Sequence, residues 1–442
     1  MLFRSNWDPK DAFSNGEKKQ YYQTELLQIL HMLANHPSFV MLTFGNELHT
    51  NEEGHAFMDE LLSSARSFDD TRLYANGSNT HYGLTGEDPQ SDFYTSMAYF
   101  EDSLRATSND FQGWLNKEYP DMRRNYDRAV ASIREKTDQP VFSFEVGQYE
   151  ILPDFGEIEE FRGVTAPESL KHIRKKVREK GFEKDWEASV EATGESSLLC
   201  YRAEVEAALR TEGYSGISLL GIQDFPGQGT ALVGMMNSHL EPKPYGFAKP
   251  ERFAAFFRDV LPLVLLPGFT YTAEQKLSAQ VMVANYGKNE LRGSLEWSLS
   301  VQNTSGGEKP AGAGDFNEGI GRIASAGTPA GRQGKLGPVT VPAGGLTKIG
   351  ILETELQGVK AACKLLLRVS FCGNVNEYPV WVYPDIRPEC PKKVYECRSF
   401  DEKARNVLKN GGILSFITSN KFFRASYGQN LREFMLKNAQ IH

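Results

Sequence analysis

Two glutamates follow short apolar runs that are typical of buried strands. Glu47 ends the run 39–47, and Glu145 lies in the run 140–148. A carboxylate at the carboxyl end of a parallel strand is unfavourable for a core, but that rim is where β/α barrels build their active sites. Two carboxylates facing one cavity are the minimum equipment for hydrolysing a glycosidic bond. The spacing therefore indicates a candidate acid/base and nucleophile pair.

Each glutamate also has a structural interpretation. Asn46 precedes Glu47, and its amide could hold a substrate hydroxyl, a contact that strengthens in the transition state of glycoside cleavage. Alternatively, Asn46 caps the helix that follows. Glu145 could equally be a strand-end carboxylate paired with an arginine or lysine. The residues by themselves leave both interpretations open.

A third element, residues 221–229, follows the last predicted α/β strand and would lie on the same rim. Gln223 and Asp224 are candidate ligands of sugar hydroxyls, although a glycine-rich turn with a capping aspartate would look the same. The glycines do not follow the GxGxxG pattern, which argues against a phosphate-binding loop. His81 and Tyr99 are weaker candidates for substrate binding at the ends of two other strands.

Strands and helices alternate over roughly residues 20–245, which is typical of a parallel α/β sheet, closed or open. The predicted strands are 38–45, 71–76, 92–99, 140–146 and 215–223. The predicted helices are 17–35, 52–67, 120–136, 167–180 and 195–211.

After about residue 250 the pattern changes to short alternating runs, which predict an antiparallel β-sandwich over 262–385. Its predicted strands include 280–285, 293–300, 346–352 and 362–371, and the segment 303–338, rich in small residues, is predicted to be a long exposed loop. The predicted organisation is a catalytic domain (1–250), the sandwich (262–385), a linker with the start of a further domain (386–411) and an unrelated tail (412–442). The fold class is α/β plus all-β.

Composition narrows the possible partners. The formal charge is −8 without a dominant basic stripe, so no nucleic-acid partner is predicted; the run 171–180 has acidic flanks and reads as a solvated helix face. No apolar run approaches the ~20 residues of a membrane span. The five cysteines form no CxxC pair, and no metal site or cofactor is predicted.

With these residues in view, the chain resembles glycoside hydrolase family 2, the family of β-galactosidases and β-glucuronidases. The resemblance rests on the segment 36–47, on 140–148 and on 219–234. It implies a (β/α)8 barrel, of which strands four to eight are recognisable, followed by an immunoglobulin-like β-sandwich. It also implies a retaining mechanism with Glu47 as acid/base and Glu145 as nucleophile, without a cofactor.

The chain departs from the family pattern at both ends. The acid/base strand begins near residue 38, so we expect an N-terminally truncated member with a partial barrel. The segment 411–434 resembles adenine-specific DNA methyltransferases of restriction systems, but the Asn-Pro-Pro-Tyr motif of that family is absent from the sequence. The tail is therefore interpreted as a foreign fragment.

The predicted function is retaining exo-hydrolysis of an oligo- or polysaccharide, with a β-galactoside-like unit as substrate. Two alternatives stay open: a non-catalytic carbohydrate-binding remnant of such an enzyme, and a fragment of a DNA-modification protein. The residues do not fix the compartment; the resemblance implies a periplasmic or extracellular location for the intact parent.

Overall fold

The structure is a computed structural model, and the chain divides into two units, Met1–Asp385 and Ile386–His442. All described residues belong to the first unit. They are 13–46, 48, 50–78, 88–96, 98–99, 102–106, 114–225, 232–301, 332–359 and 361–384. The predicted linker (386–411) and tail (412–442) lie outside the described residues, as do Glu47 and His81.

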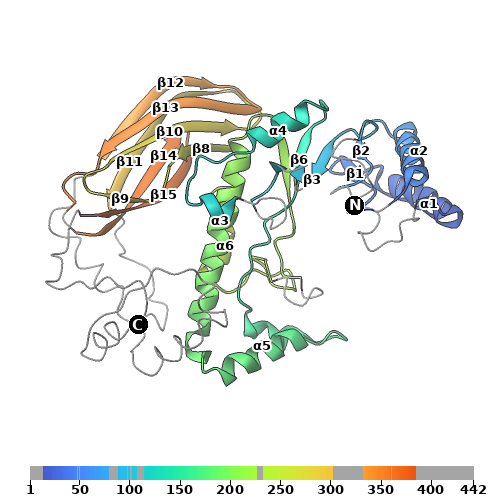
Figure 1. The fold of residues 1–442 in the computed structure, drawn as a ribbon, viewed down its shortest axis with the longest axis horizontal. Helices are drawn as coiled ribbons and strands as arrows, with labels where there is room; N and C mark the ends of the chain where they lie inside the picture. The colour runs from blue at the N-terminus through green and yellow to red at the C-terminus, as the bar shows by residue number, and fades with distance from the viewer. Residues whose placement is uncertain are drawn as a thin grey trace, which may run out of the picture. The chain divides into compact units, whose positions relative to one another are not determined.

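The first part of the chain alternates helices and strands, as the periodicity predicts (Figure 1). Its helices are α1 (Gly16–Leu33), α2 (Glu52–Phe68), α3 (Leu115–Glu118), α4 (Asp127–Arg134), α5 (Glu168–Glu179), α6 (Trp186–Leu209) and α7 (Pro250–Ala254). Its strands are β1 (Met41–Thr43), β2 (Leu73–Ala75), β3 (Tyr94–Ser96), β4 (Ala98–Tyr99), β5 (Asp102–Ser103), β6 (Val141–Val146) and β7 (Tyr214–Leu219).

The five segments predicted as barrel strands contain parallel strands that pair in chain order. β1 pairs with β2, and β3, β6 and β7 form a three-stranded sheet in that order. A backbone hydrogen bond of 2.8 Å from Asp92 to Tyr74 joins the segment before β3 to β2. The strands β1 to β7 thus form two parallel sheets, with β4 and β5 as a separate antiparallel pair. The partial barrel as a whole stays a prediction.

Helix α2 shows why the periodicity was informative. Its buried residues recur at intervals of three and four, so they form one stripe against β1 and β2. The helix begins after Asn51, whose side-chain oxygen accepts a hydrogen bond of 2.9 Å from the Gly54 amide. Asn51 is therefore the N-cap, and the alternative of Asn46 as the cap of this helix is wrong.

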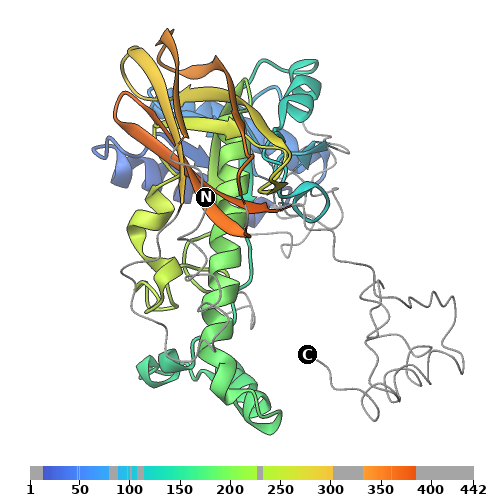
Figure 2. The same cartoon turned by 90° about the vertical axis from the view of Figure 1, so that its left-hand side faces the viewer.

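The described strands between Val260 and Tyr383 form two mainly antiparallel sheets, as predicted (Figures 1 and 2). The strands are β8 (Val260–Leu265), β9 (Thr270–Thr272), β10 (Lys276–Asn285), β11 (Leu291–Val301), β12 (Arg332–Val341), β13 (Gly345–Glu355), β14 (Cys363–Phe371) and β15 (Asn374–Tyr383). One sheet has the order β13-β10-β8 and the other β12-β11-β14-β15-β9; only the β15–β9 pair is parallel.

The predicted loop 303–338 is wrong at its C-terminal end, because β12 begins at Arg332 and pairs with β11. Gly334, in this strand, is not a loop signal. A Cβ on Gly334 would lie 2.6 Å from the indole ring of Trp297, so the glycine leaves the space that the ring fills. A glycine in a strand often marks such a close approach.

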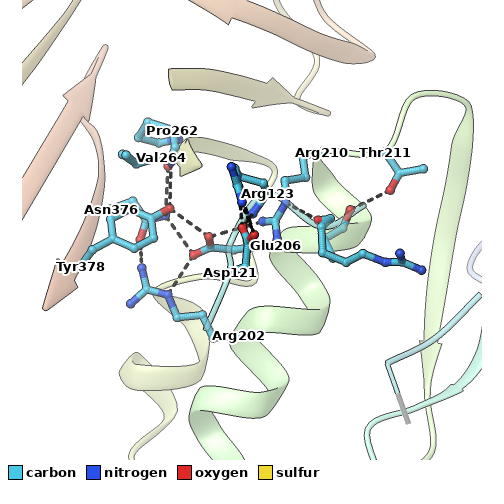
Figure 3. A network of polar contacts seen from close by, with 12 residues as sticks. Asp121, Arg123, Arg202, Glu206, Arg210, Thr211, Pro262, Val264, Asn376 and Tyr378 are labelled. Carbon is cyan, nitrogen blue, oxygen red and sulfur yellow. Dashed lines mark hydrogen bonds and ion pairs between the residues drawn. The ribbon is translucent and has the colours of Figure 1, made fainter. Parts of the chain in front are cut away.

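Helix α6 reaches the sandwich through a buried polar network around Glu206 (Figure 3). The Glu206 side chain is 0% exposed and accepts hydrogen bonds from Arg202 (2.8 Å), Tyr378 (2.9 Å) and Asn376 (3.2 Å). The guanidinium of Arg210, itself buried, lies 3.8 Å from the same carboxylate. Asn376 also donates to the Pro262 carbonyl (3.0 Å), which ties β8 and β15 to the helix. Burial lowers the pKa of Arg210.

We predict that Glu206→Gln destabilises the protein by about 3–5 kcal/mol, because it leaves buried arginines without their counter-charge. Urea unfolding followed by circular dichroism measures the difference. Glu377→Gln is the matched control: Glu377 lies one residue from Asn376 in an exposed pair with Arg368, which should contribute about 0–1 kcal/mol. Equal effects of the two variants would contradict the prediction.

Candidate active site

Glu145 lies at the end of β6 in an unusual backbone conformation. Its φ of 56° is in the left-handed region, which costs a non-glycine residue roughly 1–2 kcal/mol. The β6–β7 register shifts between Ser143 and Val146, as expected where a strand bulges. Bulges re-aim side chains and are enriched beside active sites, so the local backbone singles out Glu145 within its strand.

Two polar side chains hold the Glu145 carboxylate. The amide nitrogen of Asn46 donates to Oε1 at 3.1 Å, although the two residues are 99 positions apart. The Arg105 guanidinium lies 3.3 Å from Oε2 and donates to the Glu145 carbonyl at 2.6 Å. The Glu145 side chain keeps 13% of its surface exposed. It is therefore a fixed carboxylate that solvent still reaches.

Asn46 is itself positioned by the neighbouring strand end. The Ser78 hydroxyl donates to the Asn46 side-chain oxygen at 3.2 Å, and the Ser78 amide donates to the Gly45 carbonyl at 2.9 Å. Because the amide oxygen of Asn46 accepts from Ser78, its nitrogen faces Glu145. The segment that carries Asn46 and the predicted acid/base thus meets the segment that carries the predicted nucleophile.

A buried glutamate on α6, Glu204, accepts hydrogen bonds from the backbone beside the candidate site. The Glu204 side chain accepts hydrogen bonds from the amides of Ala106 (2.6 Å) and Gly147 (3.1 Å) and from the Tyr149 hydroxyl (2.6 Å). Ala106 follows Arg105, and Gly147 comes two residues after Glu145. One carboxylate therefore fixes both backbone segments that present the candidate site.

Burial raises the pKa of the Glu204 carboxyl, although the hydrogen bonds from Tyr149, Ala106 and Gly147 and the charge of Arg105 oppose the shift. The pKa of Tyr149 is raised well above its ordinary value, chiefly by burial and also by the nearby Glu204. The two groups are thus coupled in a region of low polarity.

Of the other predicted site residues, only Asp224 and Gln223 are described with their side chains. Asp224 is 3% exposed, and its carboxylate lies 2.9 Å from the buried Lys243 ammonium and accepts from the Gly234 amide at 2.9 Å. A hydrogen bond from Asp224 to a sugar would require the carboxylate to leave this ion pair. Gln223 is partly exposed beside it. The strand that contains Tyr99 is described, but its side chain is not, and Glu47 and His81 lie outside the described residues.

Sequence reasoning missed Arg105, Ser78 and Glu204. A usable signal existed for Glu204, because at helical spacing it lies on the same face as the apolar residues Cys200, Tyr201, Ala207 and Ala208. Arg105 and Ser78 gave no comparable signal, since polar residues after a strand are common in ordinary loops.

Family models match two short segments. The model of the Eco57I restriction-modification methylase matches residues 392–442, and that of a domain of unknown function (DUF8488) matches residues 322–384. The first match begins before the predicted tail boundary at 412. No curated protein matches the chain.

The chain is similar to solved structures of glycoside hydrolases. They include the exo-chitosanase CsxA of Amycolatopsis orientalis (10% identity, 86% of this chain, TM-score 0.44) and a β-glucuronidase of Bacteroides uniformis (10%, 87%, 0.33). A candidate β-galactosidase of Bacteroides fragilis is similar at 12% identity over 85% of this chain, with a TM-score of 0.32. The chain spans 42%, 39% and 45% of these three structures, respectively.

The raised pKa of Glu204 predicts the direction in which folding stability changes with pH. A buried acid with a raised pKa holds its proton more tightly in the folded state, so its contribution makes stability fall as pH rises above about 4.5, its ordinary pKa, and through the raised pKa. We expect Glu204→Gln to remove this fall. The stability of the wild type relative to the variant should therefore decrease from acid to neutral pH.

Urea unfolding of both proteins across the acid to neutral range tests this expectation. Glu212→Gln, which changes an exposed glutamate just beyond the same helix, sets the baseline. A wild type that gains stability relative to Glu204→Gln as pH rises would show that the hydrogen bonds to the carboxylate outweigh its burial.

Proposed function

We propose that this chain is built for retaining hydrolysis of a glycoside, with Glu145 as the nucleophile and Glu47 as the acid/base. One observation carries the proposal: the Asn46 amide lies 3.1 Å from the Glu145 carboxylate. Two segments that the sequence singled out separately, each at a strand end, therefore meet at one carboxylate. Because Glu47 follows Asn46 in the sequence, this contact supports a site with two carboxyl groups, which glycoside cleavage requires.

In the proposed reaction, Glu47 donates a proton to the glycosidic oxygen as the bond from that oxygen to the anomeric carbon breaks. A carboxylate oxygen of Glu145 forms a bond to the same carbon and gives a covalent glycosyl-enzyme. Water then attacks the anomeric carbon and gives up its proton to Glu47, and the bond to Glu145 breaks. The two carboxyl groups of a retaining enzyme are about 5–5.5 Å apart.

The residues around Glu145 fit the role of nucleophile. Asn46 and Arg105 each contact one oxygen of this carboxylate, so the attacking group is held in a fixed position. Asn46 already donates to this carboxylate, so a substrate 2-hydroxyl bound next to Glu145 would lie within reach of the same amide. We further propose that Gln223 contacts the sugar, while Asp224, through its contacts with Lys243 and the Gly234 amide, positions Gln223.

The substrate is proposed to be a terminal β-galactoside-like unit of an oligo- or polysaccharide. This choice rests on the resemblance of the segments around Asn46 and Glu145, and no contact in the described site distinguishes one sugar from another. The same resemblance leads us to propose a periplasmic or extracellular location.

Trapping the glycosyl-enzyme tests the proposal. A panel of 2-fluoro aryl glycosides slows the second step, and mass spectrometry of the chain then shows the adduct. We expect a single adduct on the peptide that contains Glu145, and no adduct in Glu145→Gln. Glu150→Gln is the matched control, because Glu150 is exposed and only five residues away.

The alternatives give different results. A carbohydrate-binding remnant would bind a sugar in calorimetry without forming an adduct, and both Glu47→Gln and Glu145→Gln would leave that binding intact. An adduct on another carboxylate would also overturn the assignment of Glu145.

A second candidate function concerns residues 392–442 alone, because they match the methylase model. A fragment of a DNA-modification protein predicts binding of S-adenosylmethionine or of DNA. We place it second because the catalytic Asn-Pro-Pro-Tyr motif is absent from the sequence. Isothermal titration of the full chain with S-adenosylmethionine tests it, and an absence of binding would oppose this function.

A further inference from the structure

A pocket lies where α6 and the residues around α7 meet the strands β14 and β15 of the sandwich. Its volume is about 400 Å³, and small-molecule sites have volumes of about 300–1,000 Å³. Protein interiors are packed with few voids larger than a water molecule. The helices and the sandwich therefore leave a space at their junction that is large enough for a small organic molecule.

One face of α6 forms a wall of this pocket. Leu198, Leu199 and Arg202 line it at helical spacing, and Glu206 continues the same face toward the sandwich (Figure 3). Glu204 leaves the helix on another side, where it accepts hydrogen bonds from backbone amides beside the candidate active site. The pocket and the candidate active site thus lie against different sides of α6.

The polar part of the lining that belongs to the Glu206 network is fixed. The Arg202 guanidinium lies 4.5 Å from the centroid of the Tyr378 ring and donates to the Asn376 amide oxygen at 2.7 Å. Asn376 is 5% exposed, and its amide nitrogen donates to the Pro262 carbonyl at 3.0 Å. Because these groups are already ordered, a ligand that binds against them pays little for ordering them.

Three further arginines line the pocket, and they keep hydrogen-bond donors to spare. Arg252 pairs with Glu195, and Arg368 pairs with Glu377 at 2.6 Å. Arg258 donates to a backbone carbonyl and has no carboxylate partner among the described residues. A guanidinium carries five N–H donors, more than these partners use. The pocket therefore offers donors to a ligand that brings an acceptor.

The charges at the pocket leave a positive excess. Four arginines line it together with Glu251 and Glu377, and the ion-pair partners outside the lining are Glu195, Glu206 and the buried Arg210. Five arginines thus accompany four glutamates. An excess of one positive charge suits a ligand with one negative group, and the guanidinium fork matches the two oxygens of a carboxylate.

Apolar side chains make up much of the remaining lining. Leu198 and Phe256 are buried, Leu199 is 40% exposed, and Val375 of β15 is partly exposed. An apolar ring packed against them would be removed from water, which is favourable. Guanidinium groups also stack on aromatic faces, so the same arginines that bind a carboxylate can cover an aromatic ring.

We propose that this pocket binds a small aromatic carboxylic acid. The carboxylate accepts hydrogen bonds from Arg258 and its neighbouring arginines, and the ring packs against Leu198 and Leu199. A neutral aromatic molecule lacks the first interaction, and a sugar acid, which is polar on all sides, lacks the second. The site uses none of the residues proposed for glycoside cleavage, so the two proposals succeed or fail separately.

Calorimetric titration of the full chain with cinnamate tests the proposal, with cinnamyl alcohol and galacturonate as comparison ligands. We expect one cinnamate per chain, bound at least about tenfold more tightly than either comparison ligand. Arg258→Gln should weaken cinnamate binding by about tenfold or more, because it removes a charge-assisted hydrogen bond. Arg292→Gln is the matched control, since Arg292 is an exposed arginine of the sandwich outside the pocket. Equal affinity for the three ligands, or equal effects of the two variants, would overturn the proposal.

Three more variants locate the ligand. Ala255 lines the pocket and is exposed, so Ala255→Trp should fill the space and abolish cinnamate binding, while circular dichroism shows that the protein stays folded. Glu251→Gln should strengthen binding several-fold, because it removes a negative charge from the lining. Glu145→Gln should leave binding unchanged. Binding that persists in folded Ala255→Trp, or that is lost in Glu145→Gln, would place the ligand elsewhere and contradict the proposal.

Discussion

Two buried carboxylates on α6, Glu204 and Glu206, constrain much of the described structure. Residues two positions apart on an α-helix are about 200° apart around its axis, so these side chains leave the helix on nearly opposite sides. Glu206 is held by Arg202 of the same helix and by Asn376 and Tyr378 of the sandwich. Glu204 is held by backbone amides beside the candidate site. Because burying a carboxylate without partners is very unfavourable, the helix has little freedom to rotate or slide.

The hydrogen bonds of Glu204 connect α6 to the backbone of the candidate site. Glu204 binds Ala106 and Gly147, which flank the segments that present Arg105 and Glu145. Glu145 has a positive φ that a non-glycine residue keeps only when its surroundings hold it there. We infer that the hydrogen bonds of Glu204 help to maintain this strain, since they fix the chain two residues beyond Glu145. The site is thus built from one strained carboxylate and several fixed neighbours.

The buried carboxylates of the α/β part are held by hydrogen-bond donors. The carboxylates of Glu145, Glu204 and Glu206 each have close donors in the described structure. Single buried polar atoms without a hydrogen-bond partner occur beside them, at Arg105 Nε and Arg210 Nη2. Among the described residues, every helix is too short or too polar to cross a lipid bilayer.

Local periodicity in the sequence determined the main elements. It predicted the change from alternating helices and strands to antiparallel strands near residue 260, and it placed Glu145 at a strand end. These features follow from the spacing of apolar residues over a few turns, which the chain carries with it. Gly334 shows the limit: a glycine in a strand opposite Trp297 looks like a loop residue until its partner strand is known.

Only the tertiary structure decided which polar groups meet. Asn46 and Glu145 are 99 residues apart, as close in space as a hydrogen bond requires, and Glu204 reaches Ala106 across 98. Such contacts depend on strand pairing and helix rotation, which are set by the packing of the whole unit and leave no local pattern. The sequence could therefore propose the residue types of a glycoside-cleaving site, whereas Arg105, Ser78 and Glu204 became visible only when the fold brought them to Glu145 and Asn46.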